Sequence, residues 1–241
     1  MTTEAVVDSI EQASRALISY PKQAEFGRPI PKNKVYEKAG VNTRLKNLFV
    51  EQVDQIVWRY KLAPETINLP ERPDVPEIQI FAIALKTSEL HLDVLRCIDD
   101  AVQYPVIYEL TQETGAETVT KVIAAYKRPS ESGANRWVLS SYFSTGWLPA
   151  TCERTSMPVA LHLGGLYEQL LYRLTPLRPR PQESLPELVT RIEQVRAKQR
   201  ELDKASSRLA KEKQFNRKVG INAQLRKLKN ELETLKKRSE T

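Results

Sequence analysis

The sequence predicts an α/β fold, with a mixed sheet flanked by helices and followed by a C-terminal helical arm that resembles a coiled coil. Three patterns lead to this prediction: a strand-helix-strand succession over residues 77–110, two alternating strands around a polar loop over 119–146, and heptad-spaced apolar residues after residue 185. We expect residues 1–182 to form the α/β body and residues 183–241 the arm. The chain has 241 residues, 41% of them hydrophobic and 28% charged, which is typical of globular proteins.

The first third of the chain predicts mostly helix. Apolar residues spaced by three and four predict an amphipathic helix over residues 4–18, and three prolines make residues 20–34 an irregular connector. A second helix is expected from Asn42 or Thr43, either of which can cap it, to the residue before Pro64. Residues 66–69 are then expected to be briefly extended.

The middle of the chain predicts the sheet. The continuous apolar run at 77–86 indicates a central strand covered on both faces, and Ser88 can cap the helix that follows it. A second apolar strand at 105–110 completes a βαβ unit, for which we expect a right-handed crossover if the strands are parallel. Strands at 119–127 and 136–146 predict a hairpin, and residues 158–174 predict the last helix of the body.

The tail carries the net charge. Residues 1–182 contain 21 Lys and Arg against 21 Asp and Glu, whereas residues 183–241 contain 16 against 9, which accounts for the net charge of +7. The tail is therefore the candidate for attraction to nucleic acid or to an acidic partner, the alternative being a merely solvated helix face. Our candidate nucleic-acid-binding residues are basic side chains around and beyond the middle of the tail: Lys211, Lys213, Arg217, Lys218, Arg226 and Lys227.

The same tail has an apolar seam. Seam positions recur at intervals of four and three from Leu188 to Leu209, where Gln199 and Ser206 interrupt the leucine, isoleucine and valine residues. The same spacing recurs from Ile221 to Leu235, with a break expected near 215–220. Two helical arms around a joint follow from this pattern. Because so thin a seam is stabilised only by packing, it must meet the other arm, a second copy of the chain or a different protein.

Several function classes are disfavoured by the sequence. No run of 18 apolar residues predicts a membrane span, and the N-terminus lacks the pattern of a signal peptide, so we expect a cytoplasmic protein. Cys97 and Cys152 lack metal-ligand spacing and are expected to be reduced thiols. Neither the two histidines nor Gly164–Gly165 forms a zinc or phosphate-binding motif, so we expect no resident cofactor or metal.

A metal-dependent nuclease of the PD-(D/E)xK type is the enzymatic alternative. Such a site needs carboxylates on neighbouring strands around Mg²⁺, and its candidates here are Glu51, Asp74, Glu77 and Gln79. Glu77-Ile78-Gln79 supplies glutamine where the motif has lysine. Lys86 cannot replace that lysine, because it lies about 30 Å further along the same strand.

A second patch combines basic and aromatic residues. Lysines and an arginine interleave with Trp58 and Tyr60, which is a pattern that can bind phosphates and stack on bases. On the predicted helix, however, the two aromatic residues would lie about 200° apart. A solvated face beside ordinary core aromatics is therefore the competing interpretation; the basic members are Lys32, Lys34, Lys38, Lys46, Arg59 and Lys61, with Tyr36 nearby.

Read as a whole, the chain resembles an uncharacterised bacterial and archaeal family of domains of unknown function. The resemblance spans nearly the whole chain, and the segments that carry it are residues 30–36, 51–64, 66–69, 77–81 and 213–218. It implies a small accessory protein encoded beside a superfamily-two helicase or restriction-type ATPase and a DNA methyltransferase, in loci that suggest defence against phage. It supplies no catalytic residue.

Our leading hypothesis is thus a non-catalytic accessory subunit whose α/β body docks on a helicase or methyltransferase. The basic arm would serve assembly, with self-association as one possibility, and could also contact DNA. A free-standing nucleic-acid-binding protein is the third hypothesis, and it predicts strongly salt-dependent binding through residues 183–241.

Overall fold

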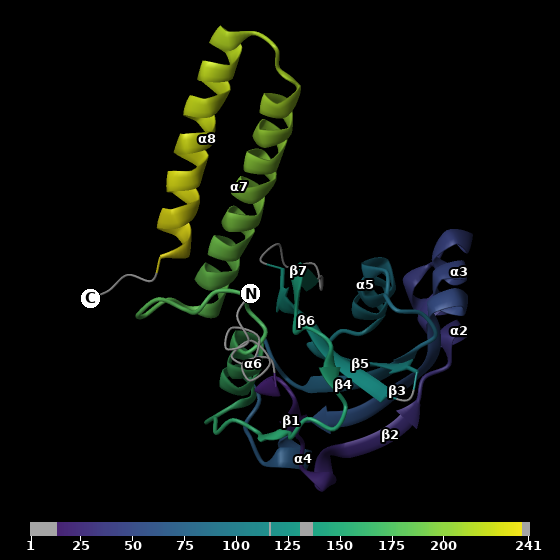
Figure 1. Ribbon diagram of the computed structural model, residues 1–241. Helices are drawn as coiled ribbons and strands as arrows, with labels where there is room; N and C mark the ends of the chain where they lie inside the picture. The colour runs from purple at the N-terminus through teal and green to yellow at the C-terminus, as the bar shows by residue number, and fades with distance from the viewer. Residues whose placement is uncertain (1–13, 116, 131–136, 238–241) are drawn as a thin grey trace. The chain divides into compact units, whose positions relative to one another are not determined.

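A computed structural model describes residues 14–115, 117–130 and 137–237 (Figure 1). The chain divides into two compact units, Met1–Thr175 and Pro176–Thr241. The second unit begins at Pro176, earlier than the boundary that we expected after residue 182. Residues 4–13 of the predicted helix over 4–18 lie outside the described residues, and its last residue, Ile18, is instead the first residue of a short strand.

The first unit is built on a mixed seven-stranded sheet, as predicted. Only β4 and β5 pair in parallel, whereas every other neighbouring pair in this sheet is antiparallel. A separate parallel pair is formed by β1 (Ile18–Ser19) and β9 (Thr155–Ser156). The strands of the large sheet, in spatial order, are β2 (Glu25–Pro29), β3 (Val53–Leu62), β4 (Ile78–Leu85), β5 (Val106–Thr114), β6 (Glu117–Pro129) and β7 (Trp137–Ser144), with β8 (Leu148–Pro149) beside β6.

The predicted βαβ unit is present at the centre of this sheet. Strand β4 leads through α5 (Leu92–Ala101) to β5, and Ile80 pairs with Ile107 in the parallel register. The helix is capped by His91 rather than by Ser88: Nδ1 of His91 accepts a hydrogen bond of 3.2 Å from the Asp93 backbone N–H. The predicted hairpin is also confirmed, because β6 and β7 pair in antiparallel fashion.

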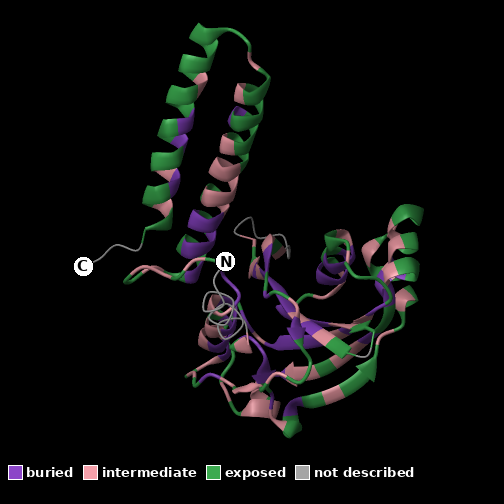
Figure 2. Ribbon diagram, viewed as in Figure 1, coloured by how far each residue is buried: buried purple, intermediate pink, exposed green. Residues whose placement is uncertain are grey.

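Helices cover both faces of the sheet. On one face, α2 (Lys32–Ala39), α3 (Thr43–Gln52) and α5 enclose a hydrophobic core around Phe49, Phe81 and Tyr108 (Figure 2). On the other face, α6 (Leu163–Tyr172) packs against β6, where Tyr167 stacks on Tyr126 with ring centroids 6.3 Å apart. This arrangement explains why β4 is apolar along both of its sides.

The predicted long helix over residues 42–63 is wrong in its second half. Helix α3 ends at Gln52 and the chain continues directly into β3, which pairs with β4. The register of β3 shifts between Val53 and Gln55 and again between Trp58 and Tyr60. These bulges place buried Val53 and Ile56 three residues apart, so a strand acquires the apolar spacing of a helix.

Two shorter expectations also need correction. The expected irregular connector at 20–34 contains a 3₁₀ turn, η1 (Lys22–Ala24), followed by the edge strand β2, and its last residues begin α2. The first two residues of the expected extended piece at 66–69 belong instead to the short helix α4 (Pro64–Ile67). Pro64 stands in the first turn of α4, where its missing N–H costs nothing, and Thr66 Oγ1 accepts the Ala63 N–H at 3.0 Å.

The second unit is a helical hairpin, as the two-arm prediction required. Helix α7 (Leu185–Lys211) and helix α8 (Phe215–Lys236) lie side by side, and their buried residues face each other (Figure 2). The chain reverses at 212–214, earlier than the expected break at 215–220, so that Gly220 lies inside α8. The seam is filled within the hairpin by Ala205, Leu225 and Leu228, with Leu202, Leu209 and Ile221 packed around them.

Arginine side chains close the foot of this hairpin. Arg191 of α7 binds Glu183 through two nitrogens, at 2.6 and 2.8 Å, and donates to the Leu235 carbonyl at 3.0 Å. Arg180 donates to the Thr234 carbonyl at 2.9 Å. Both arginines thereby satisfy carbonyls at the C-terminal end of α8, which has no further helical turn to do so.

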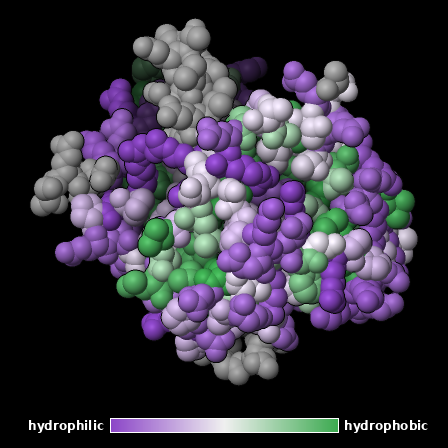
Figure 3. Space-filling view, turned by 90° about the horizontal axis from the view of Figure 1, so that it is seen from below, coloured by the Kyte–Doolittle hydropathy of each residue, from purple (hydrophilic) through white to green (hydrophobic). Residues whose placement is uncertain are grey.

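The described helices include none that is both long enough and apolar enough to span a membrane. On the face of the molecule seen in Figure 3, apolar surface lies in separate patches between hydrophilic side chains.

Candidate functional site

The four candidates for a nuclease metal site do not converge. Glu51 is exposed near the end of α3, beside the end of β4 where Val53 pairs with Leu85, whereas Glu77 precedes the first residue of β4. The length of β4, about 23 Å at 3.3 Å per residue, separates the two ends. Asp74 is exposed in the turn before β4. Among the described residues, no group of three or more His, Cys, Asp or Glu side chains is placed to hold a metal ion.

Glu77 and Gln79 do lie together, and both are buried. The Gln79 side-chain amide donates to one Glu77 oxygen, and Lys61 Nζ lies 3.4 Å from the other. Lys61 also pairs with Glu65 at 2.6 Å, and this hydrogen bond is the main reason that the pKa of Lys61 is raised. The Glu77 carboxylate is therefore neutralised by protein groups at the start of the strand.

Two buried charge clusters lie elsewhere in the first unit, and the sequence did not reveal them. Asp99 accepts a hydrogen bond of 2.5 Å from the Tyr142 hydroxyl, and its carboxylate lies 3.8 Å from Lys127 Nζ. Glu109 binds Arg154 through two hydrogen bonds of 2.8 Å. The partners in each cluster come from elements that are far apart in the sequence. The only local sign of them is a charged residue at a position where the apolar pattern predicts a core residue.

The six basic candidates in the tail are all exposed. They lie between residue 211, at the end of α7, and residue 227, in the second half of α8. The connection between the helices is organised by Glu212, whose Oε1 accepts the N–H groups of Lys213 and Gln214, both at 2.9 Å. The hydrogen bond from Gln214 is the main reason that the pKa of the Glu212 carboxyl is lowered. This carboxylate therefore shapes the turn and leaves the surrounding cations in excess.

We call residues 204–226 the basic tip. Its only acidic residue is Glu212. Lys211, Lys213 and Lys218 form no ion pair with another described residue, whereas Lys227, just outside the tip, lies 4.0 Å from Glu231. The seven cations of the tip are Lys204, Arg208, Lys211, Lys213, Arg217, Lys218 and Arg226.

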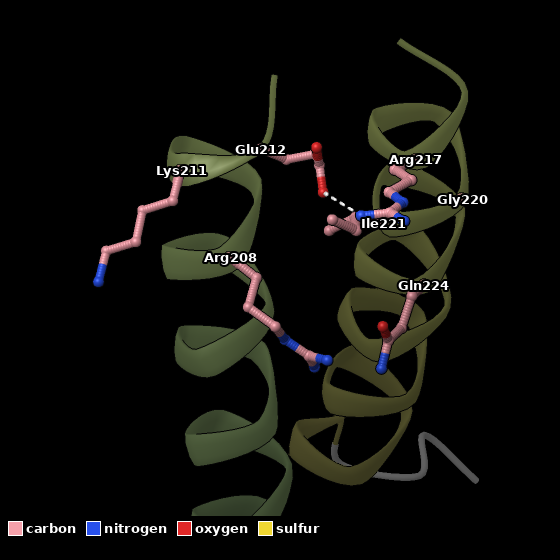
Figure 4. Close-up of a pocket in the computed structure, with 7 residues that line it drawn as sticks. All are labelled: Arg208, Lys211, Glu212, Arg217, Gly220, Ile221 and Gln224. Atoms are coloured by element: carbon pink, nitrogen blue, oxygen red, sulfur yellow. Dashed lines mark ion pairs between the residues drawn. The ribbon is translucent and has the colours of Figure 1, made fainter. Parts of the chain in front are cut away.

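A groove of about 510 Å³ opens between the two helices at this tip (Figure 4). Arg208 from α7 and Gln224 from α8 point into it from opposite sides, and Arg217 lies 4.0 Å from Glu212 above them. The Lys211 side chain points away from the groove (Figure 4). The groove thus offers guanidinium and amide donors to a ligand that reaches the tip, while Lys211 extends the positive surface around it.

An apolar element accompanies these cations. Phe215 is 78% exposed and Val219 is 54% exposed, and the two lie one turn apart at the start of α8. Arg226 follows Val219 by seven residues and so shares the same side of the helix. Exposed aromatic and basic side chains on one helix can contact both the bases and the phosphates of a nucleic acid.

The comparisons with known proteins give a family but no function. No curated protein matches the chain, and no solved structure does. One family model matches residues 18–232, which cover both units. The chain therefore belongs to the family described as a domain of unknown function, DUF4391.

Proposed function

We propose that the protein is a non-catalytic accessory subunit of a larger DNA-processing enzyme, a helicase or a DNA methyltransferase, and that its basic tip contacts nucleic acid. In this proposal the α/β body docks on the enzyme, and the hairpin reaches the nucleic acid on which the enzyme acts. A restriction-like defence system against phage is the setting in which such a subunit would work.

One observation carries the proposal: the hairpin fills its own apolar seam and concentrates positive charge at its tip. Because Leu225 and Leu228 are buried against α7, the exposed side chains of the basic tip are available for other contacts. Seven cations against one carboxylate over residues 204–226 give this free surface a strong positive potential. Cations that lack a protein counter-ion are those that displace condensed counter-ions from nucleic acid.

The test compares two triple variants of the full chain. K211Q/K213Q/K218Q removes three charges from the tip, and K229Q/K236Q/K237Q removes three exposed lysines from the opposite end of α8. Both variants change the net charge equally and leave the seam intact. Any difference between them therefore reports on position rather than on total charge.

Binding to a labelled duplex and to a single strand of about 20 nucleotides is measured by fluorescence anisotropy between about 50 and 200 mM salt. We expect the tip variant to lower the slope of log K against log salt by about 2 to 3 units, and the control variant by less than about one. Equal losses in the two variants would contradict a contact at the tip, as would a wild-type chain that binds neither probe.

The accessory role is tested separately by co-expression with a helicase or DNA methyltransferase encoded beside the protein. We expect a complex that survives size-exclusion chromatography and that the tip variant still forms, since docking is assigned to the body. Nucleic-acid binding without such a complex would favour the free-standing binder instead.

A further inference from the structure

A pocket of about 560 Å³ lies in the first unit, far along the chain from the basic tip. Its walls are the edge strand β2, helix α2 and the last turn of α5 with the residues that follow it, and its floor includes Trp58 of β3 and Phe81 of β4. A volume of this size is within the range of small-molecule sites. Neither the helical hairpin nor the family match accounts for it.

Aromatic rings line one side of this pocket because of the bulge in β3. The register shift between Trp58 and Tyr60 turns the two rings to opposite faces of the sheet, so Trp58 meets Phe26 at 4.2 Å between centroids, while Tyr60 meets Tyr20. The Trp58 indole N–H donates to the Tyr60 carbonyl at 3.0 Å, which fixes the ring. Phe26, Trp58 and Tyr104 remain partly exposed at the pocket. They form a surface against which a flat ring can stack.

Cations line the opposite side, and none of the described lining residues is acidic. Lys34 and Lys38 are exposed, lie four residues apart on α2 and form no ion pair with another described residue. Like charges at this spacing repel each other, and a lysine in the first turn of a helix also opposes the helix dipole. Arg28 lies over the Phe26 ring at 4.4 Å from its centroid. An anion bound between these side chains would relieve both unfavourable placements.

The polar side chains of the pocket can form hydrogen bonds with a bound ligand. Gln79, only 4% exposed, lies among the lining residues, and Gln103 lies at the exposed rim. Glu77, to which Gln79 donates, is already neutralised by Lys61 at 3.4 Å and adds little repulsion toward an anion. Amide side chains are suited to hydrogen bonding with the donors and acceptors of a base.

We propose that this pocket binds a nucleotide unit, with the base against Phe26, Trp58 and Tyr104 and the phosphate between Lys34, Lys38 and Arg28. The unit is either a free nucleotide or one residue of a single-stranded nucleic acid, since both present the same base and phosphate. The site is separate from the basic tip and does not depend on the function proposed for it.

Isothermal titration calorimetry with the full chain tests the site, using nucleoside monophosphates, the matching nucleosides and inorganic phosphate as separate probes. The variant K34Q/K38Q removes the phosphate contacts, and K22Q/K46Q is its matched control, since Lys22 and Lys46 are exposed lysines of the same unit outside the pocket. Tyr104→Leu removes a stacking ring and Tyr104→Phe retains it. Circular dichroism confirms that each variant is folded.

We expect a nucleotide to bind at least 10-fold more weakly to K34Q/K38Q, and within about twofold of wild type to K22Q/K46Q. Tyr104→Leu should weaken binding of the nucleotide, whereas Tyr104→Phe should bind it as wild type does. A nucleoside that binds as tightly as the nucleotide would overturn the phosphate assignment. Inorganic phosphate that binds as tightly would overturn the base assignment.

A second arm separates the two sources of the nucleotide unit. A single-stranded oligonucleotide is titrated into K211Q/K213Q/K218Q, in which the tip is neutralised, with and without K34Q/K38Q. If the oligonucleotide binds but the mononucleotide does not, and K34Q/K38Q abolishes that binding, the pocket takes one residue of a single strand. If the mononucleotide binds, the pocket takes a free nucleotide. If neither probe binds with a Kd below about 1 mM, the proposal is wrong whatever the basic tip does.

Discussion

Both units close the C-terminal end of a helix with a buried cation, but they surround that cation differently. In the first unit, Lys127 of β6 donates to the Asp99 carbonyl at 2.5 Å and to the Val102 carbonyl, at the end of α5. In the second unit, Arg191 donates to the Leu235 carbonyl, at the end of α8. A cation is favourable at either place because carbonyls at a helix end lack partners and carry partial negative charge.

The difference lies in the carboxylate beside each cation. Burial raises the pKa of Asp99 to about 6 and lowers the pKa of Lys127, so the first unit holds both charges at a cost in free energy. The two hydrogen bonds from Arg191 hold the pKa of Glu183 below its usual value instead. A forked guanidinium at the hairpin foot thus compensates its partner more fully than a single ammonium does inside the sheet.

The largest effect is expected when the buried lysine loses its charge. Lys127→Met leaves two carbonyls without their donor and the Asp99 carboxylate without its nearby cation, and we expect the free energy of unfolding to fall by about 3 to 5 kcal/mol. Urea unfolding followed by tryptophan fluorescence measures this, because all three tryptophans lie in the first unit. Lys121→Met, on the same strand but part-exposed, should cost less than about 1 kcal/mol. Similar losses in both variants would contradict a special role for Lys127.

The raised pKa of Asp99 predicts a pH dependence. The folded state holds the Asp99 proton more tightly than the unfolded chain does, so the stability gained is fully present below about pH 4 and is lost as the pH rises through about 6. A shift of this size corresponds to about 3 kcal/mol. The difference in unfolding free energy between wild type and Asp99→Asn should therefore change across this range. A flat difference for Asp99→Asn would refute the prediction.

The pattern of correct and wrong predictions has a physical origin. Strand β4 was predictable because its apolar run is unbroken, and α5 because its buried residues keep a helical spacing. Strand β3 was not, because two bulges replace its alternation with intervals of three. The hairpin turn was predicted too late in the chain because the apolar spacing is interrupted over residues 215–220, whereas Glu212 in fact organises the turn.

The candidate sites divide in the same way. The basic tip was visible as local charge density along one segment, since helical neighbours in space are neighbours in sequence. The nucleotide pocket was only half visible: Lys34, Lys38 and Trp58 had drawn attention as a basic and aromatic patch. Phe26 is brought beside Trp58 by the pairing of β2 with β3, and Tyr104 is brought to the same pocket by the βαβ crossover. No local sequence pattern predicts that these three residues lie together.

A smaller effect is expected at the foot of the hairpin. Arg191→Met removes the donors to Glu183 and to the Leu235 carbonyl, and we expect a loss of about 2 kcal/mol, concentrated in the second unit. Hydrogen exchange at the backbone amides of residues 228–236 should accelerate, while the fluorescence transition of the first unit stays unchanged. Arg200→Met, exposed on the same helix, is the control. A shift of the fluorescence transition equal to that of the hairpin would mean that the two units unfold together.

The smallest effects should have opposite signs in the two units. Gly220 lies inside α8, and a Cβ added there meets no atom within 4 Å, so Gly220→Ala should stabilise the hairpin by about 0.5 to 1 kcal/mol. Gly40 also has open space around it, but it ends α2 with φ at 61°. Gly40→Ala should therefore destabilise the first unit by about 1 kcal/mol through backbone strain alone. Helix content measured by circular dichroism during urea unfolding follows the first substitution, and tryptophan fluorescence follows the second. Because neither added methyl group meets another atom, effects of the same sign would contradict the assignment of both effects to the backbone conformation of each glycine.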